Sequence, residues 1–172
     1  FEYQSGFTWD HIKRFKDTHD VTLILKGIAT AEDAALCVEH GVDVVYVSNH
    51  GGRQLDQGRG ALDVLPEVVA AVGGRARVIV DGGFNRGGDI VKAKILGADL
   101  VGMGRMPCFG LAAAGQAGLE RVLEILEEEV RICLGLLGAP GWSALDRSHL
   151  HAAAPVVPPH VTSAFPLIGE GY

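Results

Sequence analysis

Four short apolar runs, rich in β-branched residues, recur along the chain, and each ends in a turn that contains glycine. They read V-T-L-I-L-K-G-I (21–28), V-D-V-V-Y-V-S-N-H-G-G (42–52), A-R-V-I-V-D-G-G (76–83) and A-D-L-V-G-M-G-R (98–105). Segments with helical spacing lie at 30–40, 62–72, 87–96 and 117–137. Apolar strands that alternate with helices are typical of a parallel sheet covered by helices, so the sequence predicts an α/β fold.

Further segments flank these repeats. The stretch F-T-W-D-H-I-K-R-F-K predicts a helix with Thr8 or Asp10 as its N-cap. After Gly138, the stretch A-P-G-W-S-A-L-D-R-S-H-L predicts one short helix capped near Ser143. Residues 152–172 contain too many prolines for a helix or a central strand, which predicts an extended tail.

Composition places this chain of 172 residues, 48% of them hydrophobic, among globular domains. A net charge of −6 without a cluster of basic residues argues against a nucleic-acid partner. Three cysteines, Cys37, Cys108 and Cys133, form no C-x-x-C pair and favour a reducing compartment. We find no signal-peptide pattern and no apolar run near the roughly 20 residues that cross a bilayer, so we expect a cytoplasmic protein without a membrane span.

Four strand–helix units are too few for a closed barrel. A complete (β/α)8 barrel takes about 250 residues, and a four-stranded half exposes two strand edges and an apolar inner face. Three alternatives stay open at this point: a piece of a larger chain, two halves that pair, or an open, doubly wound sheet. We favour a piece of a larger chain.

Polar and glycine residues follow all four apolar runs. They are Lys26-Gly27, the stretch from Ser48 to Arg53, Asp81-Gly82-Gly83 and the stretch from Gly102 to Arg105. Ligands of parallel α/β folds bind at the carboxyl ends of the strands, where these residues meet. Each has an ordinary structural explanation when taken alone, but together they predict one shared anionic ligand.

The last two strand ends suggest that this ligand carries a phosphate. D-G-G-F-N-R-G-G-D and G-M-G-R both place glycines before a predicted helix, whose N-terminus carries partial positive charge. Loops after the last two strands of a barrel are a recurrent phosphate site. We therefore expect backbone N–H groups and Arg105 to bind a terminal phosphate.

The same motifs resemble a known family. L-K-G-I-A-T-A-E-D-A, V-S-N-H-G-G-R-Q-L-D, V-L-P-E-V, D-G-G-F-N-R-G and G-M-G-R are similar to the carboxyl-terminal half of the FMN-dependent α-hydroxy acid oxidases and dehydrogenases, from about Trp9 to His149. The resemblance implies a TIM (β/α)8 barrel of which residues 1–151 supply about strands 5 to 8. It also implies FMN as cofactor and oxidation of a 2-hydroxy acid to a 2-oxo acid.

The resemblance also implies a role for each site residue. His50 is similar to the family's catalytic base, and Arg53 to the arginine that binds the substrate carboxylate. Lys26 and Ser48 resemble contacts to the flavin ring. The ribityl and phosphate contacts are implied for Asp81, Gly82, Gly83, Phe84, Asn85, Gly104 and Arg105.

These residue types suit those roles. A guanidinium binds a carboxylate through two parallel hydrogen bonds, and an imidazole takes up a proton near neutral pH. A lysine ammonium beside the pyrimidine edge of a flavin stabilises the negative charge that accumulates there on reduction. Hydride transfer to the flavin and proton transfer to His50 both stay open for the carbon-bound hydrogen.

One position departs from the family pattern. The phosphate loop often reads D-G-G-V-R-R-G in the family and reads D-G-G-F-N-R-G here, so Asn85 stands where an arginine is common. Arg86 matches the second arginine, whose side chain can point elsewhere. We expect Arg105 to be the main phosphate cation and Asn85 a weaker contact.

The resemblance leaves the amino-terminal half of the barrel unmatched, and with it further flavin contacts, substrate-binding tyrosines and the aspartate that orients the base. We expect the amino-terminal half to be a partner of this chain, and we expect residues 1–172 alone to bind FMN weakly or not at all. By resemblance, we also expect a homo-oligomer, namely a tetramer.

The alternative is a non-catalytic half-barrel that binds phosphate or a partner chain. The H-G-G-R pair argues against another phosphate-binding barrel, such as an isomerase. His149 and His151 lack matching ligands, so no metal is expected.

Overall fold

A parallel sheet of four strands forms the centre of the computed structural model, which describes residues 6–55 and 57–152. The strands are β1 (Ile24–Ile28), β2 (Val44–Val47), β3 (Arg77–Val80) and β4 (Leu100–Val101), in the spatial order β1-β2-β3-β4. All three neighbouring pairs are parallel. The predicted α/β class is therefore confirmed, and each predicted apolar run supplies one strand.

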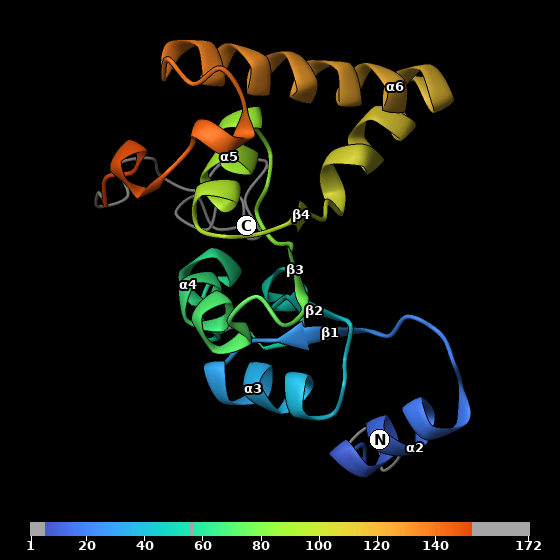
Figure 1. Ribbon diagram of the computed structural model, residues 1–172. Helices are drawn as coiled ribbons and strands as arrows, with labels where there is room; N and C mark the ends of the chain where they lie inside the picture. The colour runs from blue at the N-terminus through green and yellow to red at the C-terminus, as the bar shows by residue number, and fades with distance from the viewer. Residues whose placement is uncertain (1–5, 56, 153–172) are drawn as a thin grey trace.

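Helices connect and flank the strands (Figure 1). They are α2 (Trp9–Thr18), α3 (Ala31–Glu39), α4 (Ala61–Val72), α5 (Gly87–Ile95) and α6 (Arg105–Leu136). Thr8 is the N-cap of α2, so of the two predicted alternatives Thr8 is confirmed. At the start of α3, the Thr30 hydroxyl accepts a hydrogen bond from Asp33 N at 3.2 Å. These caps mark the residues after which α2 and α3 begin.

The last helix is longer than its predicted range of 117–137. It begins at Arg105, directly after β4, and is broken at Ala114 and Gly115, where φ is −153° and 59°. Glycine tolerates this left-handed conformation, so the chain changes direction there and the second part of α6 runs across α5 (Figure 1). The sequence pattern detected only the second part.

The segment after α6 corrects the prediction of one short helix capped near Ser143. Two separate 3₁₀ turns form instead, at Trp142–Ala144 and Arg147–His149. Asp146 caps the second turn, because its carboxylate accepts a hydrogen bond from Ser148 N at 2.8 Å. The predicted tail, 152–172, lies outside the described residues except for Ala152.

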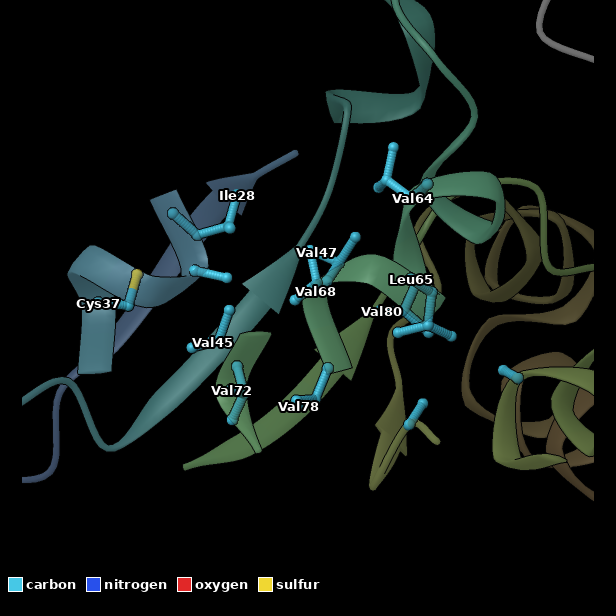
Figure 2. Close-up of a cluster of buried hydrophobic side chains, with 14 of the residues drawn as sticks. Ile28, Cys37, Val45, Val47, Val64, Leu65, Val68, Val72, Val78 and Val80 are labelled. Carbon is cyan, nitrogen blue, oxygen red and sulfur yellow. The ribbon is translucent and has the colours of Figure 1, made fainter. Parts of the chain in front are cut away.

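Valine side chains on one face of the sheet form the hydrophobic core with α3 and α4. Val45 and Val47 on β2 and Val78 and Val80 on β3 are buried against Leu65 and its neighbours on α4 (Figure 2). Burying a valine or leucine side chain stabilises a fold by about 1.5–3 kcal/mol. This packing holds the strands in register and so aligns their carboxyl ends.

The opposite face of the sheet is partly open. One residue from each strand lies in a row across it, in the order Lys26, Tyr46, Ile79 and Leu100. Leu100 is 63% exposed, and Ile24, two residues before Lys26 on the same face of β1, is 50% exposed. A four-stranded half of a barrel was expected to present such a face.

Candidate functional site

A cavity of about 470 Å³ lies at the carboxyl edge of the sheet and is bordered by the ends of all four strands. Every predicted site residue except Ser48 lines it: Lys26, His50, Arg53, Asp81, Gly82, Gly83, Phe84, Asn85, Gly104 and Arg105. Its volume is in the range of cofactor and small-molecule sites. The fold therefore brings together residues that are up to 79 positions apart in the chain, from Lys26 to Arg105.

Ser48 lies beneath the cavity, where it is 2% exposed. Its Oγ accepts a hydrogen bond from Lys26 Nζ at 2.8 Å and another from the backbone N–H of His50 at 3.1 Å. The hydroxyl thus holds the lysine of one strand and the turn that carries the imidazole of the next strand. Its contact is with these two residues rather than with the cavity itself.

Lys26 also forms an ion pair across the sheet. Its Nζ lies 3.2 Å from Oδ2 of Asp81 at the end of β3. An ammonium has three N–H donors, and Ser48 and Asp81 account for two of them. One donor remains for a ligand in the cavity that Lys26 lines.

The turn that carries His50 has an unusual backbone. His50 has a φ of 55°, the only positive φ of a non-glycine residue in 6–55 and 57–152, and Gly51 and Gly52 follow with φ of 69° and 71°. Asn49 supports the turn, since its Oδ1 accepts from Gly51 N at 3.0 Å and its Nδ2 donates to Arg59 O at 3.2 Å. Such left-handed residues are costly and concentrate at functional sites.

This backbone directs the imidazole over the neighbouring strand. A Cβ added to Gly27 would lie 3.4 Å from His50 Cε1, an ordinary van der Waals contact, so the ring lies directly against β1 at this glycine. The side chain of His50 is exposed on the cavity side. The glycines next to it therefore serve to present the ring rather than only to connect two elements.

Two arginines line the cavity from different elements. Arg53 ends the turn after His50, and Arg105 is the first residue of α6. A Cβ added to Gly51 would lie 3.5 Å from Nη2 of Arg105, which places that guanidinium beside the His50 turn. The cavity thus has exposed cationic groups from both its β2 and its β4 sides.

The loop after β3 is built on glycines with positive φ, 104° at Gly82 and 80° at Gly83. The side-chain amide of Asn85 donates to Gly83 O at 3.3 Å and lines the cavity. The backbone N–H groups of Asn85 and Arg86 both donate to Asp89 Oδ2, at 3.2 and 3.1 Å. The Asp89 carboxylate therefore already accepts the two backbone N–H groups that precede α5.

Arg86 points away from the cavity, as its ambiguous position in the sequence allowed. Its Nη2 lies 2.7 Å from Oε1 of Glu129 on α6, and Gly87 N donates to the other oxygen at 2.7 Å. The Arg86 guanidinium, with the Gly87 N–H second, holds the pKa of Glu129 below its usual value. Arg105 is consequently the arginine of the two that lines the cavity.

The structure adds two findings about the residues that line the cavity. Phe84 borders the cavity, but its side chain is buried in the hydrophobic core. Further lining residues, to which the sequence analysis assigned no role, are Gly51, Gln54, Gly102, Met103, Met106 and Cys108. The first four lie within the quoted S-N-H-G-G-R-Q and G-M-G-R motifs, whereas Met106 and Cys108 carried no signal of their own.

Two features are absent from the residues that the structure describes, a metal cluster and a membrane-spanning helix. Residues 6–55 and 57–152 contain no group of three histidine, cysteine or acidic side chains arranged to hold a metal ion. In the same ranges, every helix is too short or too polar to serve as a transmembrane segment.

Comparisons with known proteins give a consistent picture. Residues 2–152 match the family model of FMN-dependent dehydrogenases. An L-lactate oxidase of Nostoc sp. is 46% identical over 146 residues, which are 85% of this chain and 40% of that protein. A peroxisomal (S)-2-hydroxyacid oxidase of Arabidopsis thaliana is 43% identical over 86% of this chain and 41% of its own length.

Solved structures agree with these sequence relatives. A mandelate oxidase variant solved with a monooxide FMN adduct superposes with a TM-score of 0.77 and 46% identity, covering 80% of this chain and 44% of that one. An (S)-mandelate dehydrogenase, described as a monotopic membrane protein, gives a TM-score of 0.81 at 41% identity, covering 84% and 38%.

The chain spans about two fifths of the length of the curated relatives that it matches. Within that span, the family model covers the whole sheet, the cavity and the helices around them. The strand ends that form the cavity, the family match and the solved relatives lead to one conclusion: this chain belongs to the FMN-dependent dehydrogenase family, whose cofactor is FMN.

Proposed function

We propose that this chain supplies strands 5 to 8 of a (β/α)8 barrel that oxidises a 2-hydroxy acid to a 2-oxo acid with FMN. One observation carries the proposal: His50 and Arg53 lie on one short turn and line the same cavity as Lys26 and Arg105. A base, a carboxylate-binding cation and cations for an anionic cofactor thus surround one space. Relatives named as lactate and 2-hydroxyacid oxidases support this class of reaction.

The open sheet supports the assignment to half a barrel. β1 and β4 are edge strands, and the row from Lys26 to Leu100 leaves apolar side chains exposed on the face opposite the helices. Four further strands from the amino-terminal half of the barrel would pair with both edges and cover this face. That half is the principal partner we propose for residues 1–151.

The residues around the cavity fit FMN. Lys26, held by Ser48, provides an ammonium for the flavin ring, and Arg105 provides a guanidinium for the phosphate. A Cβ added to Gly83 or to Gly104 would meet no atom within 4 Å, so the backbone at both positions is open to a ligand. When bound, FMN supplies the two-electron oxidation that no side chain of the cavity can perform.

His50 and Arg53 act on the substrate in this proposal. The planar guanidinium of Arg53 binds the carboxylate through two parallel hydrogen bonds and thereby fixes the α-carbon. The imidazole of His50 takes up one proton from the substrate, as a general base held by its strained turn. One small substrate can contact both side chains, because His50 and Arg53 lie three residues apart on the same turn.

Anaerobic titration of the complete, flavin-loaded protein with a panel of 2-hydroxy acids tests the proposal. Stoichiometric bleaching of the flavin absorbance by at least one member of the panel is expected. A flavin that stays oxidised with every 2-hydroxy acid, while a chemical reductant bleaches it, would overturn the assigned reaction. The cytoplasmic location and the homo-oligomeric state stay predictions.

A further inference from the structure

Tyr46 on β2 reaches across the sheet beneath the cavity. Its ring lies under Lys26, with Nζ 5.1 Å from the ring centroid. Its hydroxyl reaches the end of β4, since a Cβ added to Gly102 would lie only 1.9 Å from that oxygen. The side chain therefore spans from its register partner on β1 to a glycine two strands away.

Asp81 lies beside this hydroxyl, and one of its carboxylate oxygens makes no hydrogen bond within the described residues. Its Oδ2 pairs with Lys26 at 3.2 Å, whereas Oδ1 is buried and has no hydrogen-bond partner among the described residues. The same added Cβ on Gly102 would lie 3.3 Å from the Cβ of Asp81, so the carboxylate and the phenol border one small space. An unpaired buried carboxylate oxygen is costly, and a phenol O–H is a suitable donor.

The surroundings keep the phenol in its donating form. Burial raises the pKa of Tyr46, and the Asp81 carboxylate raises it further, because both disfavour a phenolate. The hydroxyl therefore retains its proton throughout the physiological range. If the Tyr46 hydroxyl donated to Oδ1 while Lys26 pairs with Oδ2, both oxygens of the Asp81 carboxylate would be satisfied.

We propose that Tyr46 is a positioning residue of the flavin site, whose hydroxyl donates a hydrogen bond to Asp81 and whose ring supports the Lys26 ammonium. This inference rests on the proposed placement of Lys26 beside the flavin. A hydrogen bond from Tyr46 disperses part of the negative charge of Asp81. The carboxylate then neutralises the Lys26 ammonium less, and the ammonium attracts negative charge on the ligand more strongly. Without the hydroxyl, Asp81 neutralises Lys26 more fully and the reduced flavin is less stabilised.

Gly102 provides a sharp test, because an alanine there displaces the hydroxyl. With Tyr46→Phe the nearest remaining ring atom is Cζ, 3.0 Å from the added Cβ, and it needs to give by only a few tenths of an ångström. The effects of Gly102→Ala and Tyr46→Phe should therefore overlap rather than multiply. Ile79→Val, in the same row on β3, is the matched control that changes packing without touching a hydroxyl.

The experiment uses the complete, flavin-loaded protein and measures both the FMN dissociation constant and the flavin reduction potential. Tyr46→Phe and Gly102→Ala should each raise the dissociation constant about 5- to 10-fold, the effect of one lost hydrogen bond, and shift the potential to more negative values. The double variant should resemble the single ones, and Ile79→Val should leave the potential unchanged. Multiplying effects with an unchanged potential would overturn the inference.

Two further measurements separate this inference from the proposed function. If Lys26→Met lowers the flavin potential and Tyr46→Phe does not, the Tyr46 inference fails alone. If Lys26→Met leaves the potential unchanged, the placement of Lys26 beside the flavin fails. In that case the titration of the Tyr46 phenol tests the contact with Asp81. It is measured in FMN-free protein as the difference between the protein with Tyr46 and the Tyr46→Phe variant. The titration should move to lower pH with Asp81→Asn, and an unmoved titration would exclude the contact.

Discussion

Arg86 and Glu129 form an ion pair of 2.7 Å that joins the start of α5 to the second part of α6. Glu129 also accepts the backbone N–H of Gly87 at 2.7 Å, so one carboxylate serves both a guanidinium and a helix N-terminus. A Cβ on Gly87 would lie 2.5 Å from the Glu129 Cβ, which shows how closely the two helices approach. The ion pair with Glu129 holds the Arg86 side chain against α6.

Glu129→Gln should destabilise the protein and alter its response to acid. The pKa of Glu129 is lowered from 4.5 in the folded state, so its contribution is present above pH 4.5 and is lost as pH falls through the folded pKa. Urea unfolding at neutral pH and below pH 4 should show a smaller acid-induced loss in the variant. The exposed neighbour Glu128→Gln serves as the control, and an equal change in both variants would contradict this role.

Arg105→Met should weaken FMN binding far more than Arg86→Met. Loss of a hydrogen bond to a charged phosphate costs about 1.5–3 kcal/mol, which corresponds to a dissociation constant raised about 10- to 100-fold. Arg86 is held by Glu129, so its removal should change the constant by less than about 3-fold. Fluorescence titration of FMN-free protein measures both values, and a larger effect at Arg86 would refute the assignment of Arg105.

His50→Ala should abolish flavin reduction by a 2-hydroxy acid while FMN stays bound. A positioned general base contributes about 10²- to 10⁴-fold to a rate, so stopped-flow reduction should slow by at least about 100-fold. The flavin spectrum should persist, because Lys26 and Arg105 are unchanged. The exposed His19→Ala, at the end of α2, is the control, and normal turnover in His50→Ala would exclude the assignment.

Arg53→Lys should weaken substrate binding more than it slows flavin reduction. Lysine keeps the positive charge but lacks the planar fork that binds a carboxylate through two hydrogen bonds. We expect the KM for a 2-hydroxy acid to rise about 10-fold or more, with a smaller change in the rate at saturation. Steady-state kinetics separates the two constants, and an unchanged KM would argue against a carboxylate contact.

Cys37 should make stability sensitive to alkaline pH. This thiol on α3 is fully buried, and burial, with Asp33 as a lesser cause, raises its pKa from 9.0 to about 11. Its contribution is present below pH 9 and is lost between pH 9 and about pH 11, by at most about 3 kcal/mol. Urea unfolding across this range should show the loss in the wild type and in Cys133→Ala, and a smaller loss in Cys37→Ala, where the contribution of Tyr46 remains.

Much of the fold was predictable because local rules and the tertiary structure agree. The β-branched runs at β2 and β3 are continuously apolar apart from Arg77, which predicted interior strands of a parallel sheet, and every second residue of each is buried. The carboxyl ends of parallel strands meet at one edge, which is why Lys26, His50 and Asp81 share a cavity as expected. Thr8 and Thr30 likewise marked the beginnings of two helices through chemistry that acts within one turn.

Other features were left open by the sequence or were missed. The direction of Arg86 was left open, and only the packing of α6 turns its side chain toward Glu129. The start of α6 was missed because Gly115 interrupts the apolar pattern, although the helix continues on both sides of the break. Asp146 replaced the expected cap because two 3₁₀ turns have other starting points than one helix.

By itself, the sequence determined the parallel α/β architecture, the edge of the sheet that carries the cavity and the residue types that meet there, since these depend on periodicity and on glycine positions. Only the tertiary structure decided which side chains face that cavity. Ser48 lies beneath Lys26, and Tyr46 reaches Gly102 across two strands. Such contacts are set by side-chain packing between strands, which no pattern along a single chain encodes.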